Sequence, residues 1–419
     1  MNSVWRHLSS LAMTVAVLTI MACSAQADSV EQAKSAIAAG NIGRAMELLR
    51  PLADGGSPVA QYELGLIHHT GVGVPQDYRK AAHWYGKATE KAHADAQNAL
   101  ARLYVSGLGV DSNPDEALRL LRLAANQGGA VHQFDLASFY EAGLGGGADP
   151  ALAAQWYGKA HEQGLADATA SLGLLYFEGK GVEKDLTRAL ALFLEAAEKG
   201  HARAQNNLGL MYVKGEGTAQ DYEAAVKWFA AAAEQGMAKA ITNLGVMYDN
   251  GFGVPQDDAK AIELYRLGGR SGSTDANTAV SAAQFVYDSR IAPIDPENAL
   301  PSNFTTEAGH GDPIAMFQLG YVYATGGKAR PDYIKAAKWF QRSADKGLPA
   351  AMANLGLLYV RGLGVPQDYV YGHMWISLAA ASGLLEAVPI RNEVAASLNA
   401  NQLNEAQSLA IERWPARGN

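Results

Sequence analysis

Apolar and small residues recur along this chain with the spacing of helix faces. In the stretch 167–202, Ala168, Leu172 and Tyr176 lie four positions apart, which places them on one side of a helix. A second apolar stripe with helical spacing runs from Ala189 to Ala196. The stretch is therefore predicted to be a pair of helices.

Glycine and aspartate mark the ends of these two helices. Gly179 follows the first stripe, and glycine accepts the left-handed conformation that commonly ends a helix. Gly181 and Val182 form the connecting turn, Asp185 precedes the second stripe in the position of an N-cap, and Gly200 follows it. The unit is predicted to be a helical hairpin with a short turn.

This unit repeats every 36 residues over most of the chain. The columns that show it are Leu64, Leu100, Leu136, Leu172, Leu208 and Leu244; Tyr104, Tyr140, Tyr176, Tyr212 and Tyr248; and Gly71, Gly107, Gly143, Gly179, Gly215 and Gly251. The pattern resumes with Leu319, Tyr323 and Gly326, and again with Leu355, Tyr359 and Gly362. A fixed period of about 20 to 50 residues indicates a stacked array, so the fold is predicted to be an all-α solenoid.

Bulky and small residues alternate at fixed heights of the second helix. The bulky column contains Trp84, Leu120, Trp156, Leu192, Trp228, Leu264, Trp339 and Trp375, and alanines such as Ala81 and Ala189 form the small column. Although these aromatic side chains could form a ligand cage, their helical spacing favours core packing.

The repeat divides the chain into six predicted parts. They are a signal peptide (1–27), N-terminal capping helices (28–57), six repeats (58–274), an irregular stretch (275–311), two repeats (312–383) and C-terminal capping helices (384–419). The irregular stretch contains Pro293 and Pro296, which argue against a continuous helix. Two interpretations stay open for it, a decayed repeat that bends the array and a tolerated surface insertion.

The recurring pattern Ala-x-x-x-Leu-Gly-x-x-Tyr-x-x-Gly-x-Gly-Val-x-x-Asp-x-x-x-Ala-x-x-Trp resembles the Sel1-like repeat family and covers residues 58–383. The resemblance implies a right-handed α/α superhelical solenoid, related to tetratricopeptide arrays, of about eight to nine 36-residue hairpins with capping helices. It also implies an adaptor or scaffold, often exported to the bacterial periplasm or outer membrane.

Net charge and the N-terminal sequence limit the classes of partner and the cellular compartment that we expect. The net charge is −8 without a lysine or arginine cluster, so nucleic acid is not an expected partner. Arg6 and His7, the apolar stretch Leu11–Met21 and the cleavage motif Ala25-Gln26-Ala27 predict a secretory signal cut before Asp28. This apolar stretch is about half the length needed to span a bilayer, and no other segment comes near it. We expect a periplasmic or secreted protein.

The single cysteine, Cys23, lies inside this signal and allows an alternative. The sequence Ile20-Met21-Ala22-Cys23 resembles a bacterial lipobox, in which Cys23 would carry lipid and anchor an outer-membrane lipoprotein. Cleavage after Ala27 is favoured, because methionine fits the second lipobox position poorly. In both cases the mature chain has no disulfide or cysteine nucleophile.

No catalytic, cofactor or metal motif is apparent. His68 and His69 are adjacent, so their side chains point apart on a helix, and His68 stands in the tyrosine column. The Gly-x-Gly turns lack the Gly-Lys-Ser/Thr ending of a phosphate loop. The resemblance also implies a link to β-lactams, because some Sel1-like proteins act on them. Those members are cysteine-rich, and this chain lacks their cysteines. We therefore expect no enzyme, and a β-lactam or cell-wall hydrolase is the third hypothesis.

A partner would be expected on first-helix positions that vary between repeats. In related arrays the first helices line the concave face, and the candidate residues on it are Tyr62, Asn98, Arg102, Phe134, Asn206, Thr242, Phe317 and Tyr321. Their mixture of apolar, aromatic and amide groups suits a protein segment better than a charged polymer. An alternative is that the apolar members pack against the next repeat.

Two hypotheses for function follow. The favoured one is an exported scaffold that binds envelope proteins along its concave surface. The alternative is a component of exopolysaccharide or cell-wall assembly, for which Tyr62, Phe134 and Phe317 would have to be exposed aromatic platforms.

Overall fold

The computed structural model describes residues 28–145, 147–271, 284–294, 302, 304–326 and 330–414. Within these ranges the regular structure is helical and no strand is present, which confirms the all-α solenoid. The predicted signal peptide, Cys23 and parts of the stretch 275–311 lie outside the described residues.

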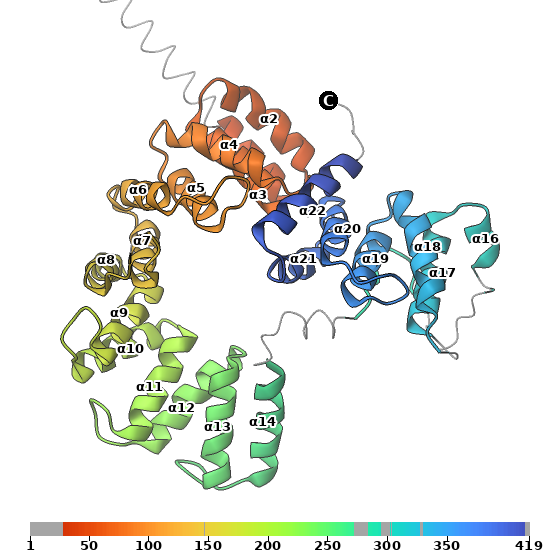
Figure 1. Cartoon of the computed structure of the whole chain (residues 1–419). Coiled ribbons are helices and arrows are strands. Elements are labelled where there is room, and N and C mark those ends of the chain that lie inside the picture. The colour runs from red at the N-terminus through yellow and green to blue at the C-terminus, as the bar shows by residue number, and fades with distance from the viewer. Residues whose placement is uncertain are drawn as a thin grey trace, which may run out of the picture. The chain divides into compact units, whose positions relative to one another are not determined.

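Eight hairpins form the body of the array (Figure 1). Their first helices are α3 (Pro58–Thr70), α5 (Ala94–Ser106), α7 (Ala130–Ala142), α9 (Ala166–Glu178), α11 (Ala202–Lys214), α13 (Ala238–Asn250), α17 (Pro313–Thr325) and α19 (Pro349–Arg361). Their second helices are α4 (Tyr78–Thr89), α6 (Pro114–Ala125), α8 (Pro150–Glu162), α10 (Leu186–Glu198), α12 (Tyr222–Glu234), α14 (Asp258–Ser271), α18 (Tyr333–Asp345) and α20 (Tyr369–Ala381).

The predicted helix ends are confirmed in atomic detail. Gly179 ends α9 with φ +73°, and Asp185 caps α10 by accepting a hydrogen bond from the Arg188 amide at 2.9 Å. The Asp185 amide also donates to the carbonyl of Tyr176 at 3.0 Å, which closes the turn. An Asp or Asn side chain caps each second helix in the same way: Asp77, Asn113, Asp149, Asp185, Asp221, Asp257, Asp332 and Asp368.

The alternation of bulky and small side chains builds the core. In the bulky column Trp84, Leu120 and Trp375 are buried, and Ala81 and Ala189 of the small column are buried as well. The position after the bulky column is almost fully buried in four repeats, at Tyr85, Tyr157, Phe193 and Phe229. Gly209 stands in the leucine-glycine pair of α11, and a Cβ there would lie 2.6 Å from the Phe229 ring. The glycine therefore permits the close approach of the two helices in the hairpin.

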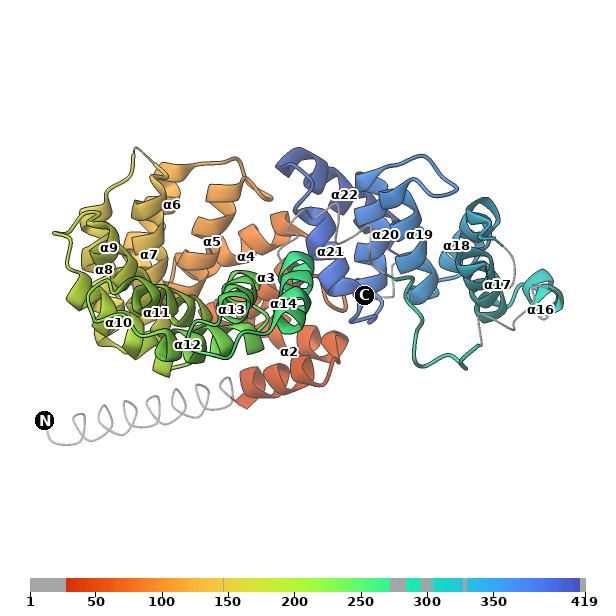
Figure 2. The ribbon, with the colours of Figure 1, turned by 90° about the horizontal axis from the view of Figure 1, so that it is seen from below.

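The chain divides into two compact units. The described residues of the first fall within Met1–Ala96, Ser106–Asp111 and Val280–Asn419, and those of the second within Gln97–Val105 and Ser112–Ala279. Figure 2 shows α13 beside α14 in the second unit, and these two helices pack against each other.

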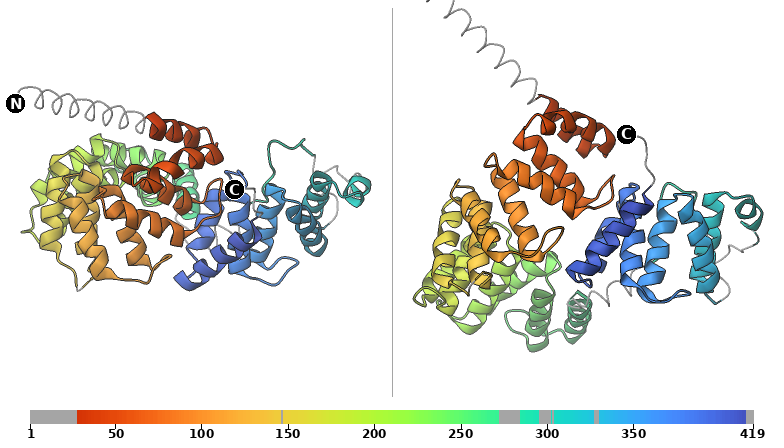
Figure 3. Two further views of the ribbon diagram at one scale, coloured as in Figure 1. Left: turned by 90° about the horizontal axis from the view of Figure 1, so that it is seen from above. Right: turned by 45° about the horizontal axis from the view of Figure 1, so that its top comes forward.

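Additional helices flank the hairpins of the first unit. Residues 28–38 and α2 (Ile42–Asp54) precede α3, and α16 (Thr305–Gly309) precedes α17. At the C-terminus α21 (Ala387–Ala395) and α22 (Ala400–Arg413) both pack against α20, and Figure 3 shows these blue helices as one group. Asn399 caps α22 through a reciprocal pair of hydrogen bonds with Gln402.

Candidate interaction surface

In the second unit, the predicted partner-binding residues Asn98 and Arg102 belong to a charged network. Asn98 donates to Asp135 Oδ2 at 2.6 Å, and Arg102 Nη2 pairs with Asp135 Oδ1 at 2.7 Å. Asn98 is buried, whereas 63% of the Arg102 side chain is exposed. The amide therefore ties α5 to α7, and Arg102 is the member of this network that a partner could contact.

Phe134 lies in a packed cluster. Its ring centroid is 5.4 Å from that of Tyr157, whose hydroxyl donates to Glu141 at 2.6 Å and lies 3.0 Å from Ser138. Burial and the neighbouring Glu141 carboxylate raise the pKa of Tyr157, because both disfavour the phenolate. Phe134 is half-buried, so only part of its ring is accessible.

Asn206 and Thr242 differ in accessibility. Asn206 is buried and accepts a hydrogen bond from Asn243 at 2.9 Å, so its amide links α11 to α13. Thr242 is exposed, and its hydroxyl donates to the carbonyl of Ala238 at 3.0 Å within α13. Thr242 can offer a methyl group and a hydroxyl oxygen to a partner.

A small pocket lies on the same face of the second unit. It has a volume of about 110 Å³ and is lined by Leu174, Phe177, Phe193, Asn207, Leu210, Lys214 and Glu216. Leu210 stands four positions after Asn206 on the same helix, so the pocket adjoins one of the first-helix residues that were predicted to contact a partner. An apolar hollow with one amide and two opposite charges at its rim suits a single apolar side chain of a protein.

Leu174, Phe177 and Lys214 were not among the residues expected to contact a partner. Leu174 and Leu210 are 36 positions apart, so they occupy the same column of successive first helices. In other repeats this column contains Arg102, Ser138 and Val246. A comparison of the column across repeats would therefore have shown that two large apolar residues occur in succession only at Leu174 and Leu210 among these five.

In the first unit, Tyr62 is half-buried and packs against other rings. It stacks on His93 with centroids 5.0 Å apart and tilts against Tyr85 at 5.7 Å. Phe317 is fully buried and Tyr321 is half-buried. Phe317 thus meets the alternative interpretation, in which an apolar candidate packs within the array, and it is not an exposed aromatic platform.

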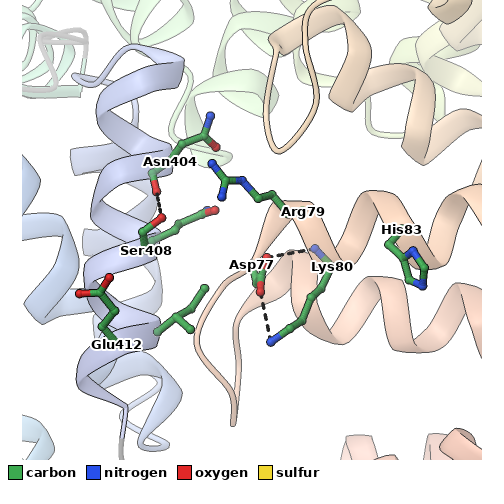
Figure 4. Close-up of a pocket in the computed structure, with 9 residues that line it drawn as sticks. Asp77, Arg79, Lys80, His83, Asn404, Ser408 and Glu412 are labelled. Atoms are coloured by element: carbon green, nitrogen blue, oxygen red, sulfur yellow. Dashed lines mark hydrogen bonds and ion pairs between the residues drawn. The ribbon is translucent and has the colours of Figure 1, made fainter.

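A larger pocket of about 430 Å³ lies in the first unit between α4 and α22 (Figure 4). Gln407 connects these elements by donating to Gln76 at 3.1 Å and accepting from the Tyr78 amide at 3.3 Å. The pocket carboxylate Asp77 is the N-cap of α4 and also pairs with Lys80 at 3.3 Å. Asp77 and Gln407 therefore serve the fold at this pocket.

The titratable side chains of the described residues were compared with what a metal site or a membrane span requires. They contain no group of three or more His, Cys, Asp or Glu side chains arranged to hold a metal ion. Burial lowers the pKa of His68 to about 4 and that of His373 to about 3, so both are neutral at pH 7. None of the described helices is long and apolar enough to cross a membrane.

Stacked hairpins with fixed packing columns and variable first-helix faces define an α/α repeat solenoid, a class of fold typical of protein–protein interaction. A profile of the Sel1 repeat matches residues 58–93, 94–129, 133–165, 166–201, 202–237, 238–273, 313–348 and 349–384. The chain belongs to the Sel1 repeat family, whose members are typically non-catalytic scaffolds.

Two solved structures of this kind resemble the chain. One is c5321, a protective antigen of uropathogenic Escherichia coli strains, with 30% identity over 92% of this chain and 94% of that chain and a TM-score of 0.52. Another is a Sel1 repeat protein from Oxalobacter formigenes, with 31% identity over 57% of this chain and 96% of that chain and a TM-score of 0.53. Among curated proteins no match was found.

Proposed function

We propose that this protein is an exported scaffold of the bacterial cell envelope that binds a segment of a partner protein along the first helices of its second unit. The observation that carries the proposal is the pocket at Leu174, Phe177 and Leu210, which lies on the variable face of the array. The expected signal sequence at residues 1–27 supports export. The similarity to a protective antigen is consistent with a protein that leaves the cytoplasm.

The chemistry of this face favours a protein partner. Arg102 and Lys214 are exposed cations, Glu216 is an anion at the pocket rim, and Leu210 supplies apolar area. Such a surface resembles a protein interface, in which an apolar centre is bordered by polar groups. A glycan would call for exposed aromatic platforms, whereas Tyr62 and Phe134 are half-buried against Tyr85 and Tyr157.

The test is crosslinking of purified protein to envelope extract, with capture measured by quantitative mass spectrometry. The pocket variant carries Leu210→Ala and Lys214→Glu, and the matched control carries Val131→Ala and Lys239→Glu at exposed positions of the same unit. We expect one partner to be captured equally by the parent and the control, and about tenfold less by the pocket variant.

Two outcomes would contradict the proposal. If the pocket variant keeps its helical circular dichroism and captures the same partner as the parent, the binding face lies elsewhere. If neither protein captures a partner but immobilised cell-wall glycan retains both, the protein acts on the polymer.

A further inference from the structure

A stretch of the chain without helix or strand, residues 284–294, lies against the last two repeats of the first unit and turns at residues 288–291. Its residues Phe285, Val286 and Tyr287 all pack against the core that α17, α18, α19 and α20 form. The stretch has no regular secondary structure, so its main-chain groups are not paired in a helix or a sheet. How this stretch is bound indicates what else the same face can bind.

Asn354 on α19 binds the main chain of this stretch directly. Its Oδ1 accepts a hydrogen bond from the Val286 amide at 2.7 Å, and its Nδ2 donates to the Val286 carbonyl at 2.8 Å. Asn354 is fully buried, and both of its polar atoms are used on one residue. A side-chain amide in this geometry holds an extended backbone whatever the bound side chain is.

Two aromatic sites flank this amide. Phe285 lies between Tyr333 and Phe340, with both centroids at 6.4 Å, and the Arg361 guanidinium is 5.4 Å from its ring. The ring centroid of Tyr287 is 5.3 Å from that of Phe317 and 5.0 Å from that of Tyr321. Alternate side chains of an extended chain point to the same side, so residues 285 and 287 fill two sites while the amide holds residue 286.

The same column shows why Asn354 is available for this task. Asn243 stands at the corresponding position of α13 and donates to Asn206 of the preceding first helix. For Asn354 the residue at the position of Asn206 is Phe317, which offers no hydrogen-bond partner. The last repeat thus presents a buried amide that requires a main chain from outside the helices.

We propose that the face formed by Phe317, Tyr321, Tyr333, Phe340, Asn354 and Arg361 is a second binding site, for an extended partner segment with aromatic side chains at alternate positions. Phe285, Val286 and Tyr287 occupy this site in the free protein, whereas Ile291 further along belongs to the buried core; a partner binds by displacing the three occupying residues. The proposal rests on the scaffold function proposed above, but it concerns a different face and a defined sequence.

The test measures binding of a fluorescent synthetic peptide with the sequence of Gln284–Ala292 to the purified protein. Replacing Phe285→Ala and Tyr287→Ala together weakens the internal occupant. Because the apparent affinity is reduced by the fraction of sites already filled, this variant should bind the peptide about tenfold or more tighter than the parent. A matched control, Ile334→Ala with Tyr371→Ala, removes apolar side chains exposed on the same unit and should bind like the parent.

Adding Asn354→Leu to the Phe285 and Tyr287 variant should weaken peptide binding at least tenfold. Leucine is close in size to asparagine but forms no hydrogen bond, so the helix packing is retained while the main-chain contact is lost. Circular dichroism and the melting temperature verify that each variant is folded.

Three results would overturn the proposal. One is a folded Phe285 and Tyr287 variant that binds the peptide no better than the parent. Another is unchanged affinity after Asn354→Leu. The third is unfolding of the Phe285 and Tyr287 variant, because the stretch would then be part of the core and not a displaceable occupant. The peptide assay contains no envelope partner, so its failure is distinguishable from a failure of the pocket at Leu210.

Discussion

The close approach of the two helices in a hairpin can be tested at Gly209. An added Cβ there would lie 2.6, 2.8 and 3.0 Å from the Cε1, Cδ1 and Cζ atoms of Phe229, which is almost fully buried. Carbon atoms in favourable contact are about 3.5 to 4.0 Å apart. The substitution Gly209→Ala therefore forces the ring or the helix to move by roughly 1 Å.

The expected loss of stability is the difference between two opposing effects. Overpacking of this kind costs about 1 to 3 kcal/mol, whereas alanine in a helix interior is favoured over glycine by roughly 0.5 to 1 kcal/mol. We expect Gly209→Ala to be destabilising by about 1 to 2 kcal/mol. Gly158 on α8 is the control, because no atom lies within 4 Å of its added Cβ, and Gly158→Ala should be stabilising by about 0.5 to 1 kcal/mol.

The second repeat suggests how to relieve the clash. Ala101 and Leu121 occupy there the positions of Gly209 and Phe229, and both are buried. Adding Phe229→Leu to Gly209→Ala should therefore recover stability, with a coupling of about 1 to 2 kcal/mol between the two changes. Urea unfolding followed by circular dichroism measures the parent, Gly209→Ala, Phe229→Leu, the double variant and the Gly158→Ala control. Additive effects, or a Gly209→Ala protein as stable as Gly158→Ala, would refute the argument that Gly209 is required for close packing.

Two further predictions concern pH and helix capping. Burial and the Arg391 cation lower the pKa of His373 to about 3, so the folded state stays neutral while the unfolded state gains a proton below about pH 6.5. The free energy of unfolding should therefore fall from about pH 6.5 toward pH 3, and this residue contributes at most about 1.4 kcal/mol per pH unit to that fall. A folded His373→Leu protein should show a shallower fall in melting temperature over the same pH range. An equal slope in the two proteins would contradict this expectation. At the start of α12, Asp221→Ala should cost about 1 kcal/mol because the Ala224 amide loses its acceptor at 2.9 Å, whereas Asp221→Asn should cost much less, and equal losses in chemical unfolding would show that the cap is not responsible.

The hairpins could be predicted from sequence because each rests on local chemistry that repeats. Gly179 and Asp185 end and begin their helices through contacts within a few residues, so their columns mark the helix boundaries. Within the predicted C-terminal capping region 384–419, α22 begins at Ala400 after its cap Asn399 in the same way. Boundaries of this kind depend on one or two hydrogen bonds that the sequence shows directly.

The candidate site was less predictable, because accessibility depends on side chains from distant parts of the chain. The column of Asn98 and Asn206 varies between repeats, as expected for partner-binding residues. Within the array, however, Asp135 and Asn243 on the first helix of the following repeat bind these two amides. Within the irregular stretch, the described residues 284–294 form no helix or strand, and Phe285, Val286 and Tyr287 pack against the last two repeats. The binding of this stretch depends on Asn354, far away in sequence, and no local pattern connects the two.

The columns of a repeat array carry two kinds of information, and the distinction separates stability from function. A position such as Gly209, whose neighbour in space is the same in most repeats, is fixed by packing and says nothing about a partner. Asn243 and Asn354 share a column and a side chain, but one binds the preceding helix and the other binds an extended main chain. The difference arises at one position of the preceding first helix, which is Asn206 in front of Asn243 and Phe317 in front of Asn354. In such a fold the residues that specify a ligand are found where a polar side chain that recurs in a column loses its partner within the array, because its hydrogen bonds must then be satisfied by something else.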